Sequence, residues 1–163
     1  MKILAAILII ILTYFILSFA TIFKNGVSIT DDPGILSRLK TFLSTHKAET
    51  ADQALFKELK TPIYETSIID AAEVIKKIAE KNAWSIEADN AASTEKHSFH
   101  YVDTTKLMRF KDDILVSLES VNSNQVLIHI ASESRVGRAD FGANLARVTQ
   151  LIDELDKQLK RLN

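Results

Sequence analysis

The sequence of 163 residues contains no cysteine, and this absence removes several kinds of chemistry. A chain without cysteine forms no disulfide bond, offers no thiolate nucleophile and builds no zinc–thiolate site. Glycine and proline are also scarce, at four and two residues, and the sequence has no internal repeat or low-complexity segment. The length suits one domain with an additional segment.

An excess of charge of either sign is also missing. The chain has 20 basic and 21 acidic residues, and no long basic run alternates with aromatic residues. Proteins that bind nucleic acid usually carry a basic patch or stripe, so nucleic acid is not an expected partner.

Motifs for metals and for phosphate-bearing cofactors are absent as well. No H-x-x-x-H or H-E-x-x-H pattern places two of His97, His100 and His129 on one helix. Gly137 and Gly142 do not form a phosphate-binding loop of either standard type. We therefore expect no cofactor and no metal, because a metal site would require histidines from different strands to converge.

One long hydrophobic run interrupts this balanced composition. Residues 3–23 contain no charged side chain, and a membrane-spanning helix needs about 20 apolar residues. The alternative is a cleaved signal peptide, with Lys2 as its charged region and Ser18 and Ala20 at its cleavage site. The run continues past Ala20 and is longer than a usual signal-peptide core, which favours a retained anchor over residues 1–23. Either interpretation takes the protein to a membrane.

The charged residues on the two sides of this run do not by themselves decide its orientation in the membrane. Positive residues tend to stay on the cytoplasmic side, but Lys2 precedes the run, and Lys24, Arg38 and Lys40 follow it. The very short N-terminal tail and the leader-like start predict a single-pass protein with an extracytoplasmic domain. That domain would be periplasmic if the source is a Gram-negative bacterium.

Residues 24–60 are expected to connect the anchor to the domain. The stretch 24–31 is typical of a short polar linker, and Asp32 before a proline is typical of a helix start. The sequence predicts one short helix from there to about residue 46, and a capping box predicts a second helix over 50–59. Their charged residues are mixed in sign, which favours packing on the domain over lying on the bilayer.

Residues 61–163 are predicted to form an α+β domain. A helix capped by Ser67 follows the first strand, and short turns between the later strands predict a mainly antiparallel sheet. The first and last helices of this region each have a single apolar stripe, so both should cover the same sheet face. The expected fold is a two-layer sandwich with about five strands and two helices on one face, preceded by a transmembrane helix. The strands are expected near residues 63–66, 84–88, 96–103, 107–121 and 126–131.

The junction between the last strand and the last helix holds the candidate site. Gly137 allows a sharp reversal after the strand, and Asp140 stands at the N-cap position of the helix. Arg135 and Arg138 lie in this junction, and Arg147 lies about two turns into the helix. The apolar stripe of the predicted helix is Phe141, Leu145, Val148, Ile152, Leu155, Leu159 and Leu162.

Arginines near a helix start are typical of an anion site. The helix N-terminus carries partial positive charge and free N–H groups, and guanidinium groups pair with carboxylate or phosphate oxygens. The candidate ligand-binding residues are Arg135, Arg138, Arg147, Ser134 and Asn144. Internal ion pairs are the commoner outcome for such clusters, and in that alternative the arginines stabilise the fold. The candidates for a structural or ion-pair role are Arg109, Asp112, Asp113, Asp140, Gly137 and Gly142.

The same residues carry a resemblance to a known family. Residues 109–113 fit the pattern R-F-x-D-D, and residues 132–147 fit S-x-S-R-x-G-x-x-D-x-G-x-N-x-x-R at every fixed position. The chain thus resembles the bacterial and plant family known as domain of unknown function 1499, over about residues 56–159. The resemblance implies no established activity, but members often have an N-terminal membrane segment. Many also carry an Asn-Cys-Val-Ser motif, for which this chain has Asn25-Gly26-Val27-Ser28, without the cysteine.

Three functions remain open at this point. The leading hypothesis is a membrane-tethered, non-catalytic module that binds an anionic ligand or a protein partner. The second is an envelope hydrolase that uses Asp112, Asp113, Ser134 and the arginines, although adjacent strand residues point to opposite faces. Asp112 also falls on the apolar face of its strand, so it is either buried and paired or displaced by a bulge. The third is a structural subunit of a membrane complex.

Overall fold

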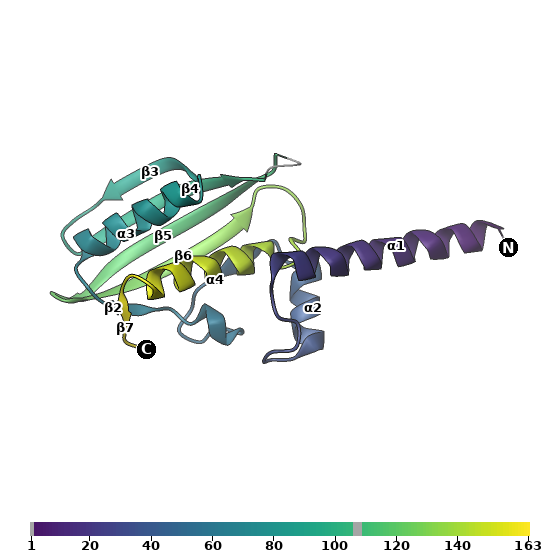
Figure 1. The fold of residues 1–163 in the computed structure, drawn as a ribbon, viewed down its shortest axis with the longest axis horizontal. Coiled ribbons are helices and arrows are strands. Elements are labelled where there is room, and N and C mark those ends of the chain that lie inside the picture. Colours follow the sequence, from purple (N-terminus) through teal and green to yellow (C-terminus); the bar gives the residue numbers. More distant parts are fainter. Residues whose placement is uncertain (1, 106–108) are drawn as a thin grey trace.

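A computed structural model describes residues 2–105 and 109–163. It confirms an α+β fold in which helices α3 and α4 lie together on one side of an antiparallel sheet, while α1 extends away from the domain (Figure 1). The elements in chain order are α1 (Lys2–Asn25), α2 (Ile35–Ser44), β1 (Lys47–Glu49), the 3₁₀ turn η1 (Lys57–Leu59), β2 (Ile63–Glu65), α3 (Ile68–Lys81), β3 (Ser85–Ala91), β4 (Lys96–Thr104), β5 (Lys111–Asn122), β6 (Gln125–Ser134), α4 (Ala143–Asp156) and β7 (Lys160–Arg161).

The sheet has seven strands in the described part of the chain, rather than the five expected. Their order is β3-β4-β5-β6-β2-β7, and β1 also pairs with β6. The long strand β6 accommodates β2 beside its first residues and β1 beside its last ones. The two extra strands, β1 and β7, are only three and two residues long. Such short strands have no alternating pattern of their own, and they form because a neighbouring strand offers free backbone groups.

Regular alternation in β5 and β6 builds the core. Ile114, Val116, Ile128 and Ile130 are at most 1% exposed and face the helices. The apolar stripes of α3 and α4 cover them, and Ser67 caps α3 by accepting a hydrogen bond from the backbone N–H of Asp70, as the capping pattern predicts. Full burial of each such aliphatic side chain contributes about 1.5–3 kcal/mol to folding.

Helix α4 begins two residues later than expected and ends sooner. Gly142, with φ +81°, precedes its first residue, and the Asp140 carboxylate accepts hydrogen bonds from the N–H groups of Gly142 and Asn144 at 2.9 and 3.0 Å. Asp140 therefore caps the helix although it lies three residues before the first helical residue, Ala143. Leu159 and Leu162 lie beyond the helix, because the chain turns there to form β7.

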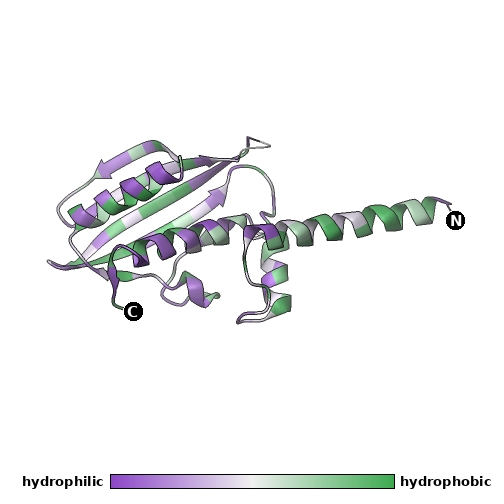
Figure 2. Cartoon of the chain, in the orientation of Figure 1, coloured by the Kyte–Doolittle hydropathy of each residue, from purple (hydrophilic) through white to green (hydrophobic). Residues whose placement is uncertain are grey.

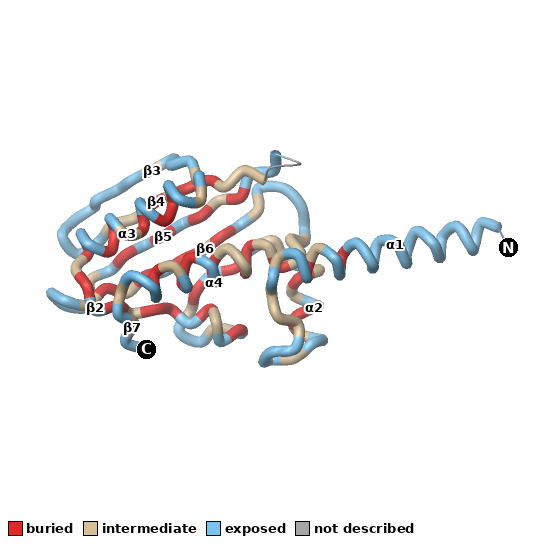
Figure 3. The backbone as a smooth tube through the Cα atoms, viewed as in Figure 1, coloured by how far each residue is buried: buried red, intermediate tan, exposed pale blue. Residues whose placement is uncertain are grey.

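The C-terminal end of helix α1 packs directly on the domain. The helix is apolar almost throughout (Figure 2) and exposed over most of its length (Figure 3), but its C-terminal turns enter the domain. Ile22 is 1% exposed and belongs to the core, and the side-chain amide of Asn25 donates to the carbonyl of Phe141 at 3.0 Å. Val27 and Ile29 also pack against the core. Residues 26–34 are irregular, as a linker would be, but Val27 and Ile29 hold this connection against the domain.

The next segment differs from the sequence prediction as well. Helix α2 begins at Ile35, after Gly34, and not at Pro33; the Asp32–Pro33 peptide bond is cis. The predicted helix over 50–59 is not formed, and this stretch contains only the turn η1. The Thr50 hydroxyl accepts a hydrogen bond from the N–H of Ile130 at 3.0 Å. Pairing with β6 thus outweighs the local capping pattern.

Candidate functional site

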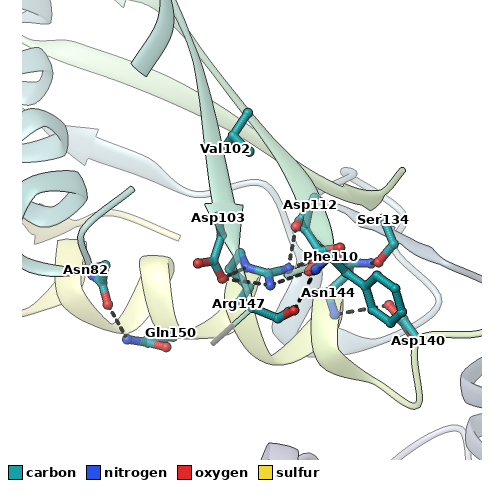
Figure 4. A network of polar contacts seen from close by, with 12 residues as sticks. Asn82, Val102, Asp103, Phe110, Asp112, Ser134, Asp140, Asn144, Arg147 and Gln150 are labelled. Carbon is teal, nitrogen blue, oxygen red and sulfur yellow. Dashed lines mark hydrogen bonds and ion pairs between the residues drawn. The ribbon is translucent and has the colours of Figure 1, made fainter. Parts of the chain in front are cut away.

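Arg147 lies at the centre of a polar network between α4 and the sheet (Figure 4). Its Nη2 donates to Asp112 Oδ2 at 2.7 Å and to Asp103 Oδ2 at 2.9 Å. Its Nη1 donates to Ser132 Oγ at 3.0 Å and to Asn144 Oδ1 at 2.7 Å. The Arg147 side chain is 10% exposed, so most of the guanidinium is shielded from water. These contacts join α4 to β4, β5 and β6.

Asn144 extends this network to the segment before β1. It is fully buried, and its amide nitrogen donates to the carbonyl of His46 at 2.7 Å and to Ser134 Oγ at 3.0 Å. Asp112 is 4% exposed, and it is paired as one of the two sequence alternatives requires. A buried charge whose partner is removed destabilises a protein by about 3–5 kcal/mol. The network therefore stabilises the contact between sheet and helix.

Arg135 lies on the opposite face of the sheet. Adjacent residues of a strand point to opposite faces, and Asp113 accordingly points away from Asp112. Arg135 Nη2 donates to Asp113 Oδ1 at 2.7 Å and to Glu87 Oε2 at 3.1 Å, and His100 Nε2 lies 2.6 Å from Asp113 Oδ1. The hydrogen bond from Arg135 lowers the pKa of Asp113 below its ordinary value.

The side chains of Glu87, His100 and Asp113 have the composition of a divalent-cation site. One ligand atom from each lies within 4.8 Å of the others. Arg135 already donates to both carboxylates, so a cation would have to displace this guanidinium. The cluster is therefore best described as an ion-pair network that includes a histidine.

Arg138 differs from the other two arginines. It is exposed, and no carboxylate pairs with it within residues 2–105 and 109–163. The preceding Gly137 has φ +102° and reverses the chain after β6. The N-terminus of α4 offers Arg138 no ready anion site, because Asp140 already occupies the N–H groups there.

Arg109 has the same character. It is exposed, has φ +57°, and has no carboxylate partner among the residues that the structure describes. It precedes β5, whose first residue Lys111 accepts a backbone hydrogen bond from Arg135 at 3.0 Å. The loops that carry Arg109 and Arg138 therefore leave neighbouring ends of β5 and β6.

The residues predicted to form the anion site thus do not converge. Arg147, Asn144 and Ser134 belong to the buried network, Arg135 belongs to the opposite face, and Arg138 lies in solvent. The groups named for a hydrolase are divided in the same way, since Asp112 and Asp113 face different sides of the sheet. Ligand binding by any of these residues stays a prediction.

Two residues of these networks, Asp103 and Glu87, are not identified by the sequence pattern. Asp103 stands opposite Asp112 in the register of β4 and β5, and like charges at such positions destabilise a sheet unless a cation neutralises them. Knowledge of this register would have shown that the two aspartates require a cation, which Arg147 supplies. Glu87 stands at an irregularity between Ile86 and Ala88 in β3, and no alternating pattern places it beside Arg135.

The sheet face away from α3 and α4 has a shallow hollow of about 560 Å³. Leu115, His129 and Ala131 line it, together with Ala88 and Asn90 at the edge. Leu115 is 50% exposed on this face. The hollow lies beside His100, and so beside the ion-pair network of Arg135.

These features define the class of protein. It is a small α+β domain with an antiparallel sheet, stabilised by a buried arginine network and packed against an apolar N-terminal helix. A model of the family described as "Protein of unknown function (DUF1499)" matches residues 30–155, so the chain belongs to that family. The match begins before residue 56, and it therefore includes α2 and β1.

No curated protein matches this chain. Among solved structures, the chain is similar to the crystal structure of the Ran-binding protein Mog1p from Saccharomyces cerevisiae. The identity is 12% and the TM-score 0.37, and the similarity covers 70% of this chain and 78% of that one.

Proposed function

We propose that this protein is a single-pass membrane protein whose α+β domain is a non-catalytic binding module held at the bilayer surface. The observation that carries the proposal is the burial of Ile22 and Ser18, at 1% and 4% exposure, within the domain. The C-terminal turns of the apolar helix are part of the folded domain.

The length of α1 supports a membrane span. The most apolar 18-residue window of the helix has a mean hydropathy of 2.8, and 6% of that window is buried. Residues 3–17 precede Ser18, the first buried residue, and 15 residues at 1.5 Å each extend about 22 Å. The other faces of α1 stay largely exposed to residue 23, and residues 3–23 extend about 32 Å, close to the hydrocarbon thickness of about 30 Å.

Removal of this helix as a signal peptide would disrupt the domain. Cleavage after Ala20 removes Ser18 and leaves Thr21 as a new, charged N-terminus next to the buried Ile22. The Asn25 side chain, which bonds to the chain just before α4, would lose the helix that positions it. The packing therefore favours the retained anchor over the cleaved leader.

The split of the candidate catalytic groups supports binding over hydrolysis. Ser134 Oγ accepts from Asn144 inside the buried network, while His100 and Asp113 lie on the other face. Asp112, the cross-strand partner of Ser134, is paired with Arg147, and no hydrogen bond joins it to the Ser134 hydroxyl among the described residues. The hollow around Leu115 is a second candidate surface, for a protein partner, because it is exposed and no helix of the α3–α4 layer covers it.

Membrane extraction and labelling test the anchor and its orientation. We expect the full-length protein to resist alkaline carbonate and to dissolve only with detergent. The chain has no cysteine, so Ser123→Cys adds one unique site at the far end of the domain. In intact cells, a membrane-impermeant maleimide should label it, because we place the domain on the extracytoplasmic side. Release by carbonate would contradict the anchor, and labelling only after cell lysis would contradict the orientation.

Photo-crosslinking tests the hollow separately. A photoreactive amino acid at position 115 of the membrane-bound protein should give a discrete crosslinked species. The matched control is position 69, where Ile69 is 72% exposed on α3. Equal crosslinking from both positions would contradict a specific surface at the hollow.

A further inference from the structure

We propose that the end of the domain beside α1 binds the phosphate groups of anionic phospholipids. The surface consists of Arg109, Phe110, Val136 and Arg138, and we call it the membrane-proximal surface. The inference rests on the proposed membrane span of α1, and it names the ligand of the exposed arginine in the β6–α4 junction.

The position of these residues is the first argument. The loop between β6 and α4 and the adjoining ends of β4 and β5 lie at the end of the domain toward which α1 extends (Figure 1). Asn25 at the end of α1 bonds to Phe141 in the loop, and the backbone N–H of Phe141 donates to Phe42 of α2 at 3.1 Å. A bilayer crossed by α1 would therefore face this loop.

The direct packing of α1 on the domain is the second argument. The helix is continuous to Asn25, and Ile22 is buried in the core, so the domain cannot move far from the point where α1 leaves the bilayer. A group held beside a surface meets it at high effective concentration, and weak contacts then suffice for binding. The loops therefore do not need an affinity for lipid that is high enough to recruit a soluble protein to the membrane.

The composition of the surface is the third argument. Val136 is 64% exposed and Phe110 is 45% exposed. Each of these apolar side chains stands next to or near an arginine, and apolar residues combined with Lys or Arg are typical of segments that lie in the bilayer interface. Lys24, at the end of α1, adds a further exposed positive charge at this end.

The state of the nearby carboxylates is the fourth argument. Asp140 is bonded to the start of α4, Asp113 is bonded to Arg135, and Asp112 is bonded to Arg147. Asp103 and Asp112 share Arg147, and Asp113 and Glu87 share Arg135, so these networks keep some negative charge. Arg109 and Arg138 are exposed and have no carboxylate partner within the described ranges. The exposed charges of the membrane-proximal surface itself are therefore positive, which complements anionic headgroups. Each such residue near an anionic surface strengthens binding by about fivefold.

Because the chain has no native cysteine, single cysteines can be introduced as unique labelling sites. Single cysteines replace Val136, Ser123 and Ile10 in three separate full-length variants, and each carries an environment-sensitive fluorophore. The proteins are reconstituted into vesicles of phosphatidylcholine alone or of phosphatidylcholine mixed with phosphatidylglycerol. Brominated acyl chains in either mixture quench a fluorophore that enters the bilayer, and iodide quenches one that stays in water.

We expect the Ile10→Cys label to be quenched by bromine in both mixtures, because it lies in the span. The Val136→Cys label should be quenched more strongly in the anionic mixture, and the Ser123→Cys label in neither. Arg109→Gln together with Arg138→Gln should remove the difference between the mixtures. The matched control is Lys96→Gln with Lys160→Gln, which removes the same charge from residues paired with Glu119 and Glu65 and should leave the difference intact.

The outcomes separate this inference from the proposed function. A quenched Ile10→Cys label with an unquenched Val136→Cys label keeps the anchor and overturns the lipid surface. Equal quenching of Val136→Cys in both mixtures overturns the recognition of anionic headgroups. Protection of that label from iodide without quenching by bromine would show a second copy of the chain on the surface, and also overturns the inference. An unquenched Ile10→Cys label overturns the membrane span itself.

Discussion

At the scale of single residues, the family motif divides into buried and exposed arginines. Arg147 contacts two carboxylates and two neutral side chains, and its side chain is 10% exposed. Arg138 contacts none of the described carboxylates and is exposed. The same residue type therefore stabilises the fold at one position and remains available at another.

The first prediction concerns Arg147. Arg147→Gln leaves Asp112 buried without a cation, which should lower the free energy of unfolding by about 3–5 kcal/mol. Arg138→Gln, the matched control, should change it by less than about 0.5 kcal/mol. Urea unfolding of the full-length protein in detergent, followed through the single tryptophan Trp84, measures both. Equal stability of the two variants would contradict the structural role of Arg147.

The second prediction concerns Gly142. Gly142 has φ +81°, and an added Cβ would lie 2.7 Å from a methyl group of Val27. Gly142→Ala should therefore cost more than the about 1–2 kcal/mol of a left-handed backbone. Gly137→Ala is the control, since it has φ +102° and meets nothing closer than 3.8 Å. Equal losses for both variants would show that the segment after α1 does not pack on α4.

The third prediction concerns pH. The hydrogen bond from Arg135 lowers the pKa of Asp113 in the folded protein. The stability that this pair contributes is fully present above the unfolded pKa of about 3.9 and is lost as the pH falls through the lower folded value. In Asp113→Asn, the melting temperature should therefore fall less steeply with acid than in the wild type. Parallel curves for the two proteins would contradict this linkage.

At the scale of elements, alternation and capping predicted the parts of the chain that have a strong local signal. Strands β4 to β6, helix α3 and the stripe from Leu145 to Leu155 all follow periods that the sequence displays. Residues 24–60 and 157–163 do not, because their structure depends on what they pack against. A capping pattern at Thr50 gives way to a bond with β6, and the C-terminal residues pair with β2.

The candidate site shows the same division. The sequence identified the arginines and both possible roles for them, but the distribution of roles depends on which sheet face each residue occupies. Asp112 and Asp113 are adjacent, yet one contacts Arg147 and the other Arg135. Only the register of β4 against β5 brings Asp103 to Arg147.

The fourth prediction concerns Arg38, whose structural role has no signal in the sequence pattern. It is fully buried, lies 4.5 Å from the ring of Phe56, and bonds to Glu58 at 2.7 Å and to the carbonyls of Asp31 and Asp32. Arg38→Gln should raise hydrogen exchange across residues 28–58. Exchange in β5 and β6 should stay as in the wild type, since they hold the core independently. Unchanged exchange over 28–58 would show that Arg38 does not hold this segment.

At the scale of the whole molecule, the helix and the domain form one body. The last turns of α1 contact the segment before α4, and the loops beside them carry exposed arginines. The anchor would therefore do more than keep the domain near a membrane, because it also fixes which end faces the bilayer. The hollow around Leu115 remains free for a partner under this arrangement.

The mass of the protein in its native membrane tests this account most directly. If the helix is a retained anchor, intact-mass measurement of the detergent-extracted protein gives a chain that still contains residues 2–23. A mature chain that begins after Ala20 and is recovered without detergent would contradict the central claim. In that case the last turn of α1 would be only the N-terminal segment of a released domain.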